Sequence, residues 1–351
     1  MNDTTYTRVP SREITKLLDE VLPSVGAEID GLHFPKLSAV VLGGGYGRGE
    51  GGVLHTANGD CLYNDLDFFV FADGASRSEA LAIQNALRGI SERWEKRLGI
   101  AVDFSPVKNV NALCRVSRTL MYQELLRGWL PVWGTLDLGE WIPAIPPAEL
   151  PFSEAARLLL NRGMGLMFAV ERLLGDKPDA DFVMRNMNKA VLGAGDALLL
   201  ASGCYHWLGE ERVQAFSGYA RQHSLSGEFV ASYERAYRYK LEPQPVLPEK
   251  PWEEWRSCRS MFLDAVRRLS GHGKDGSTME VCKGLREAAR AESSVRNMLR
   301  WLLRARSLRS LDAFLAPPVV TVLERLYQEM SLNDGKESCS SRLFALWQTF
   351  N

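Results

Sequence analysis

Two carboxylates that are separated by one apolar residue, Asp65 and Asp67, come just before the apolar run Phe68–Phe71. Because side chains i and i+2 of a strand project from the same face, both acids should point the same way while Leu66 points into the core. Neighbouring carboxylates repel each other unless a cation lies between them. Paired oxygen ligands that also meet phosphate suit Mg²⁺. The pair therefore predicts a magnesium site near the beginning of a strand.

A glycine-rich segment precedes this acidic pair. The apolar run Ala39–Leu42 is typical of a buried strand, and Gly43–Glu50 follows it with the sequence GGGYGRGE. Glycine lets the backbone approach a bulky ligand closely, and the N–H groups of such a turn can point at phosphate oxygens. The segment therefore predicts a phosphate-binding turn after the first strand.

Four residues of this turn are candidates for binding a nucleotide. We expect the backbone of Gly44 and Gly45 to approach the phosphates. Arg48 is expected to pair with a phosphate or with departing pyrophosphate, and Glu50 to orient Arg48. The alternative for Arg48 and Glu50 is an ion pair on the surface, which would contribute little to stability.

The glycine pair Gly44-Gly45 followed by Asp65-x-Asp67 resembles the nucleotidyltransferase superfamily. This superfamily includes DNA polymerase β, the aminoglycoside nucleotidyltransferases and the regulatory uridylyl- and adenylyltransferases, and the string from Gly44 to Glu50 looks most like the last group. Nineteen residues, Tyr46–Asn64, separate the two motifs here, where the family usually has about a dozen. The extra residues include the turn-rich run Thr56–Asp60, which predicts an inserted hairpin.

The resemblance implies a third carboxylate from the following strand. Asp103, within the strand pattern Ile100–Val107, matches that position in order and context. On this basis Asp65 and Asp67 would be ligands shared by two Mg²⁺ ions. Asp103 would bind the metal that holds the nucleophile and would also be a candidate proton acceptor. The alternatives are a strand-end Asp103 that faces water and an ordinary glycine turn followed by solvated acids.

The order of patterns predicts an α+β protein with two domains, a number that 351 residues allow. Residues 1–145 should form a nucleotidyltransferase fold, a small mixed sheet with flanking helices. The proline-rich segment Pro143–Pro151 is the expected linker. Helical patterns dominate afterwards, so residues 152–351 should form an all-helical domain that binds substrate or acceptor.

Charged residues on an apolar helix of this second half provide a weaker signal. Arg185, Lys189 and Asp196 lie close to one helix face. We expect Lys189 to bind phosphate or the acceptor; a buried structural contact between Lys189 and Asp196 is the equal alternative.

A basic stripe lies nearer the C-terminus, where arginines recur every four residues at 296, 300 and 304. It could bind RNA or an acidic protein. A solvated helix face is favoured, because no aromatic residues are interleaved for base stacking.

Overall composition excludes several other classes. Lys and Arg number 42 against 43 Asp and Glu, so no global charge attracts nucleic acid or an anionic membrane. No apolar run reaches the roughly 20 residues that a bilayer requires. The six cysteines and five histidines show no metal-ligand spacing. We therefore expect a soluble cytoplasmic protein without a membrane partner.

The function that these features predict is Mg²⁺-dependent transfer of a nucleoside monophosphate from an NTP to a hydroxyl acceptor, with release of pyrophosphate. The acceptor could be a small molecule, a protein or RNA, and the sequence does not identify it. Two alternatives remain open: a nucleotide sensor on a catalytically inactive transferase scaffold, and a toxin-type transferase that modifies tRNA or protein.

Overall fold

The computed structural model describes residues 5–273, 276–305, 315–335, 337 and 339–350. They form an α+β protein with a small mixed sheet, which confirms the expected class. The chain divides into two compact units. The first contains residues 1–145 together with Arg238–Pro243, and the second contains Pro146–Tyr237 and Gln244–Asn351. Within the described residues, every strand belongs to the first unit.

The sheet of the first unit is built around β4, which begins directly after Asp65. Its strand order is β5-β4-β1-β7, and β6 also pairs with β4. β1 is antiparallel to β4 and to β7, whereas β5 and β6 run parallel to β4. The strands are β1 (Leu37–Leu42), β4 (Leu66–Ala72), β5 (Val102–Phe104), β6 (Lys108–Asn109) and β7 (Leu130–Gly134).

A separate two-stranded hairpin lies between the glycine-rich turn and β4. It pairs β2 (Val53–Thr56) with β3 (Gly59–Leu62), with Thr56 opposite Gly59 at the tip. Gly59 has a positive φ of 112°, which favours glycine in this tight turn. The hairpin that the run Thr56–Asp60 predicted is therefore confirmed.

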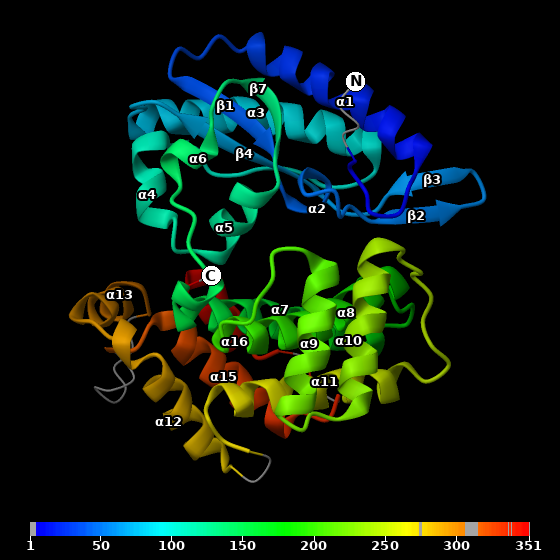
Figure 1. Cartoon of the computed structure of the whole chain (residues 1–351), viewed down its shortest axis with the longest axis vertical. Helices are drawn as coiled ribbons and strands as arrows, with labels where there is room; N and C mark the ends of the chain where they lie inside the picture. Colours follow the sequence, from blue (N-terminus) through cyan, green and yellow to red (C-terminus); the bar gives the residue numbers. More distant parts are fainter. Residues whose placement is uncertain (1–4, 274–275, 306–314, 336, 338, 351) are drawn as a thin grey trace. The chain divides into compact units, whose positions relative to one another are not determined.

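Alternating apolar residues of the strands place helices on both faces of the sheet (Figure 1). The long helices α1 (Arg12–Asp30) and α3 (Arg77–Leu98) pack on the face that carries Val40, Leu42, Leu66, Phe68 and Val70. The short helices α4 (Leu113–Val116), α5 (Leu120–Arg127) and α6 (Leu138–Trp141) pack on the face that carries Ala39, Val41, Phe69 and Phe71. By strand alternation, Asp65 and Asp67 lie on the same face as Phe69 and Phe71, Asp67 at the beginning of β4 and Asp65 just before it.

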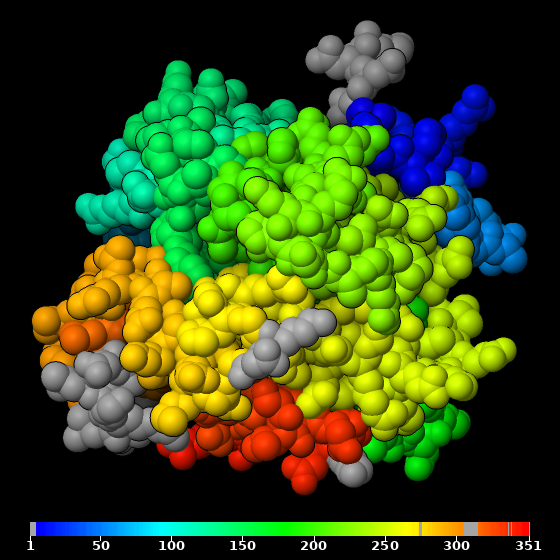
Figure 2. Space-filling model, turned by 60° about the horizontal axis from the view of Figure 1, so that its bottom comes forward, coloured from blue at the N-terminus to red at the C-terminus, as the bar shows by residue number. Residues whose placement is uncertain are grey.

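The described part of the second unit is helical. Its α7 and α8 pack closely because their contacts use small residues; a Cβ on Gly193 would lie 2.4 Å from the Arg162 side chain. In the space-filling view, the yellow and orange residues of α11 and α12 adjoin the red residues of α15 (Figure 2). The helices are α7 (Phe152–Leu174), α8 (Ala180–Ala201), α9 (Gly209–Gln222), α10 (Gly227–Leu241), α11 (Pro251–Leu269), α12 (Thr278–Ala288), α13 (Val295–Ala305), α15 (Pro318–Leu332) and α16 (Ser341–Phe350).

The last residues of α10, Arg238–Leu241, belong to the first unit although the rest of the helix belongs to the second. Short 3₁₀ turns occur at Val110–Ala112, Pro147–Glu149 and Arg290–Glu292. Across the described part of the chain, no helix has both the length and the apolar character needed to traverse a bilayer.

Candidate active site

The structure places Asp67 between the glycine-rich turn and strand β5. The N–H of Gly43 donates to the carbonyl of Asp67 over 2.8 Å, and Asp103 is the register partner of Asp67 on the parallel strand β5. The next pair, Phe68 and Phe104, stacks on the other face of the sheet with ring centroids 4.9 Å apart. Because side chains alternate along a strand, Asp67 and Asp103 project together from the face opposite these two rings.

The short strand β5 is held in place by polar side chains of α3. Three hydrogen bonds join the two elements: Ser91 Oγ donates to Val102 O, Gln84 Nε2 donates to Phe104 O, and Val102 N donates to Glu95 Oε1. Since these bonds flank Asp103 on both sides, α3 fixes the position of this carboxylate relative to β4.

The electrostatics of Asp103 show that it is close to other acids. Partial burial is the largest cause that raises its pKa, and the charges of Asp65 and Glu95 raise it further. Repulsion between Asp65 and Asp103 requires that both carboxylates occupy one neighbourhood. Asp65 and Asp67 are half-buried, while Asp103 is exposed. Asp67 and Asp103 therefore lie at the same end of β4 and β5, and Asp65 directly precedes β4 at that end.

Gly44 forms the other wall of this site. It has a positive φ of 62°, and a Cβ at this position would lie 2.1 Å from Oδ2 of Asp67. The Asp67 carboxylate thus lies directly against the Gly44 backbone, where any side chain would displace it. Gly44 also begins the single-turn helix α2 (Gly44–Gly47), whose first N–H groups have no intrahelical acceptor. Gly45 accepts a 2.8 Å hydrogen bond from the Glu50 N–H, which closes the turn.

A buried tyrosine joins the glycine turn to the residues that lead into β4. The hydroxyl of Tyr46 donates to Gly52 O over 2.8 Å and accepts from Tyr63 N over 2.9 Å. Asn64 Oδ1 accepts from Gly52 N over 2.6 Å. Burial raises the pKa of Tyr46 to about 12, so the hydroxyl remains a donor at neutral pH. The turn and the segment before Asp65 are therefore one connected structure.

Arg48 and Glu50 have partners that the sequence did not predict. Arg48 pairs with Glu124 of α5 at 3.4 Å, and Glu50 pairs with Lys240 at 2.6 Å. Glu50 thus lies beside Lys240, and its expected role in orienting Arg48 stays a prediction. Only 5% of Glu50 is exposed, so this acid is a buried support of the turn. The Nε of Arg48 is buried and has no hydrogen-bond partner within the described residues.

The segment that supplies Lys240 is the part of the site that sequence reasoning missed. Beside it, the hydroxyl of Tyr239 lies 3.0 Å from that of Tyr63. A Cβ on Gly52 would lie 2.9 Å from the Lys240 carbonyl, so the backbone also approaches closely. Spacing gave no signal for these contacts, because 190 residues separate Glu50 from Lys240.

The predicted residues of the apolar helix lie on α8 of the second unit. Asp196 accepts a hydrogen bond from the Tyr233 hydroxyl and lies 3.4 Å from Arg212 Nε, while Arg185 pairs with Asp181. Lys189 is half-buried on the same helix. Lys189 thus belongs to a different unit from the carboxylates and the glycine turn.

The basic stripe lies on α13, where Arg296, Arg300 and Arg304 are exposed. Arg304 donates to the Thr349 carbonyl over 3.3 Å. Residues 306–310, which follow the stripe, lie outside the described part of the chain.

The chemistry of the carboxylate cluster fits Mg²⁺, because every candidate ligand is a carboxylate oxygen. In the described ranges, no group of three or more histidine, cysteine or acidic side chains has the arrangement of a formed metal site. Burial, followed by the charges of Asp65 and Glu95, raises the pKa of the Asp103 carboxyl group. Asp65, Asp67 and Asp103 are the residues that the sequence predicts as Mg²⁺ ligands.

Comparisons of the chain with protein-family models, with curated proteins and with solved structures found no match.

Proposed function

We propose that the first unit is a nucleotidyltransferase that moves a nucleoside monophosphate from Mg²⁺·NTP to an acceptor hydroxyl and releases pyrophosphate. One observation carries the proposal: the Asp67 carboxylate lies against the Gly44 backbone and beside its register partner Asp103. The glycine turn that we propose for phosphate binding therefore lies next to the carboxylates that we propose for Mg²⁺ binding. Phosphoryl transfer needs little more than such positioning and charge neutralisation.

The three carboxylates have two parts in the proposed reaction, metal binding and proton acceptance. Asp65 and Asp67 hold Mg²⁺, which when bound neutralises the phosphate oxygens and the departing pyrophosphate. Asp103 would bind the metal that holds the nucleophile and would accept the proton of the acceptor hydroxyl. The acceptor oxygen bonds to the α-phosphorus while the bond from that phosphorus to the bridging oxygen breaks. The leaving group is pyrophosphate, so charge and atoms balance.

In this proposal, backbone N–H groups and the Arg48 side chain of the glycine turn bind the triphosphate. The N–H groups of Gly44 and Gly45 belong to the first turn of α2 and can point at phosphate oxygens. A buried donor without an acceptor is unusual in a protein, and the Nε of Arg48 is such a donor. A phosphate oxygen would supply the missing acceptor, so Arg48 remains our candidate for the β- or γ-phosphate. Lys189 lies in the second unit, and its part in phosphate or acceptor binding stays a prediction from the sequence.

Transfer of label from α-³²P-NTP tests this function. The full chain is incubated with each NTP, Mg²⁺ and separate pools of small hydroxyl compounds, proteins and RNA. Label should enter one pool only with Mg²⁺, and the variants Asp65→Asn and Asp67→Asn should reduce the rate by about 100-fold or more. Asp73→Asn is the matched control, because Asp73 is exposed just beyond the far end of β4.

The result of this assay also separates the alternative functions. Mg²⁺-dependent NTP binding without label transfer to any pool would favour a nucleotide sensor. Label in tRNA or protein, together with growth arrest on expression that Asp67→Asn relieves, would favour a toxin-type transferase. Failure of Mg²⁺·NTP to bind the pure chain would overturn nucleotidyl transfer altogether.

A further inference from the structure

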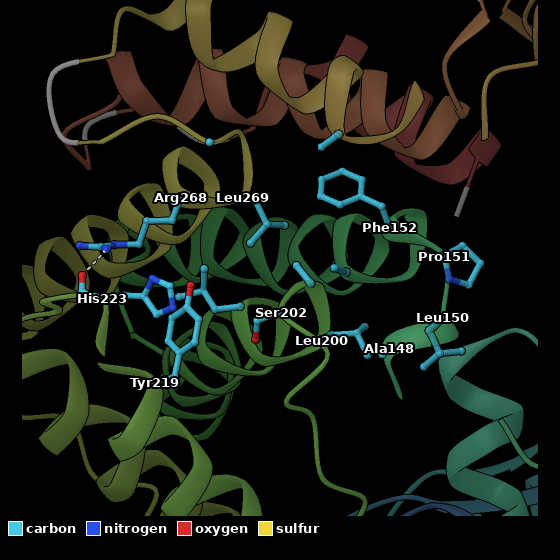
Figure 3. A pocket seen from close by; sticks show the side chains of 15 residues that line it. Ala148, Leu150, Pro151, Phe152, Leu200, Ser202, Tyr219, His223, Arg268 and Leu269 are labelled. Carbon is cyan, nitrogen blue, oxygen red and sulfur yellow. Dashed lines mark hydrogen bonds between the residues drawn. The ribbon is translucent and has the colours of Figure 1, made fainter. Parts of the chain in front are cut away.

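The second unit contains a cavity of about 440 Å³ that the proposed reaction does not use. Its walls come from segments far apart in sequence: the stretch from Ala148 to Ala155, the end of α8, the end of α9, and the ends of α11 and α12. The volume falls within the range of about 300–1,000 Å³ that is usual for small-molecule sites. Figure 3 shows the side chains that line it.

The two ends of this cavity differ in chemistry. Polar groups gather at one end, where Tyr219, His223 and Arg268 lie together (Figure 3). The opposite end is apolar, with Leu150 and Phe152 at the wall (Figure 3). The remaining apolar lining residues include Pro151, Ala155, Leu198, Leu200 and Leu269. Such a division suits a molecule that has a polar head and an apolar body.

Hydrogen bonds hold the polar end in a fixed arrangement. Arg268 Nε donates to Asp264 Oδ2 over 2.8 Å, and its NH1 donates to the His223 carbonyl over 2.9 Å. These two bonds use two of the five N–H groups of a guanidinium. The Tyr219 and His223 rings stack with centroids 4.1 Å apart. Burial raises the pKa of Tyr219, so its hydroxyl stays protonated and able to donate.

The charges at this end select the head group. Donors from Arg268 and Tyr219 favour an acceptor-rich anion, and the guanidinium opposes a cation. Asp264 pairs with Arg268, however, so the local positive charge is at most small. Asp264 repels a dianion such as a phosphate monoester more strongly than a singly charged carboxylate, and the carboxylate can still accept hydrogen bonds from the available N–H and O–H groups.

We propose that this cavity binds a small organic acid, with its carboxylate at Arg268 and Tyr219 and its apolar body against Phe152 and Leu198. The proposal does not depend on nucleotidyl transfer, because every residue that lines the cavity belongs to the second unit. It assigns the second unit a ligand site of its own.

Four compounds that share one apolar body test the head-group preference. Calorimetry on the full chain at neutral pH would compare 4-phenylbutyrate with 4-phenylbutylamine, 4-phenylbutanol and 4-phenylbutyl phosphate. The carboxylate should bind about ten-fold more tightly than each of the others, since a charged hydrogen bond contributes a difference of that order. Equal or tighter binding of the amine, the alcohol or the phosphate would overturn the proposal, as would no binding of the carboxylate.

Variants locate the binding inside the cavity. Arg268→Gln and Tyr219→Phe should each weaken 4-phenylbutyrate binding by about ten-fold or less while leaving 4-phenylbutanol unchanged. Tyr219→Phe keeps the stacked ring, so it remains informative if Arg268→Gln unfolds. Ala288→Trp should fill the cavity and abolish binding, whereas Ala291→Trp, at an exposed alanine outside the lining, should not. Unaltered binding in Ala288→Trp and Tyr219→Phe would place the acid elsewhere and contradict the proposal.

Discussion

Gly44 is the residue at which backbone conformation and the carboxylate cluster depend on each other. Its positive φ favours glycine, and its missing side chain leaves the space that Oδ2 of Asp67 occupies. Gly44→Ala should therefore cost about 1–2 kcal/mol of stability through strain. It should also weaken Mg²⁺·NTP binding by about ten-fold or more, because Asp67 must move away. Urea unfolding and calorimetry would measure the two effects.

Gly99 provides a control that separates strain from displacement. It has a similar positive φ of 71°, yet a Cβ there meets no atom within 4 Å. Gly99→Ala should lose about the same stability as Gly44→Ala and bind Mg²⁺·NTP normally. Equal nucleotide affinities in the two variants would show that the contact between Gly44 and Asp67 is not part of the site.

Asp103 gives a pH-dependent prediction. A raised carboxyl pKa means that the folded state holds the proton more tightly than the unfolded state. Stability from this group is therefore present at low pH and is lost as pH rises through the folded pKa. Without Mg²⁺ at pH 7.5, Asp103→Asn should raise Tm by roughly 1–3 °C, because it removes a charge that is disfavoured by partial burial and by repulsion from Asp65 and Glu95.

In excess Mg²⁺ the wild-type chain should have the higher Tm, since it binds the metal with the Asp103 carboxylate that the variant lacks. Thermal unfolding between pH 4 and pH 8, with and without Mg²⁺, would measure the difference in Tm between the variant and the wild-type chain under both conditions. A Tm for Asp103→Asn that stays below wild type in Mg²⁺-free buffer would contradict the crowded-acid account of this site.

The sequence was sufficient to find the three carboxylates but not their supports. Strand alternation pointed to Asp65 and Asp67 because that signal is local, and the resemblance to a known superfamily pointed to Asp103. The ion pairs of Arg48 and Glu50 involve Glu124 and Lys240, which are distant in sequence. Any exposed acid or lysine could have been the partner, so no pattern in one sequence could choose between them.

At the scale of elements, helix ends with clear caps were predictable. Ser11 begins α1 and Gly99 ends α3, as their residue types indicated. Helix α1 contains Pro23 and still continues to Asp30, where it buries Val25 and Ile29. Tertiary burial thus outweighed the missing N–H of Pro23.

The helical segment from Leu113 to Arg127 is interrupted, because Ser117–Thr119 separates α4 from α5. Gln123 donates to the Ser117 carbonyl over 2.7 Å and so satisfies a group that a continuous helix would have used. Thr119 Oγ1 donates to the Val116 carbonyl over 2.8 Å. Side chains that compete with the backbone in this way are hard to anticipate from periodicity.

The junction between the end of α10 and the glycine turn gives a prediction at this scale. Glu50 is buried and its partner Lys240 is only 22% exposed. Lys240→Met should lower the free energy of unfolding by about 1–3 kcal/mol, because it removes the ammonium group that lies 2.6 Å from a buried carboxylate. The double variant Glu50→Gln/Lys240→Met should recover much of this loss. Urea unfolding would measure it; a single-variant loss under about 0.5 kcal/mol would contradict a structural role for the pair.

At the scale of the whole molecule, the chain alternates between two units rather than dividing once. The proline-rich segment predicted a boundary near residues 145–152, and the second unit begins at Pro146. The return of Arg238–Pro243 to the first unit was not predicted, because that stretch continues an ordinary amphipathic helix. Helical periodicity reports which face is buried, not which unit buries it.

The central claim concerns the first unit, and calorimetric titration of the full chain with Mg²⁺ and a non-hydrolysable NTP tests it most directly. We predict saturable binding that requires Mg²⁺, is lost in Asp67→Asn and is retained in Asp73→Asn. Absence of binding to the wild-type chain, or equal binding in the Asp67→Asn variant, would contradict a nucleotide site at the glycine turn.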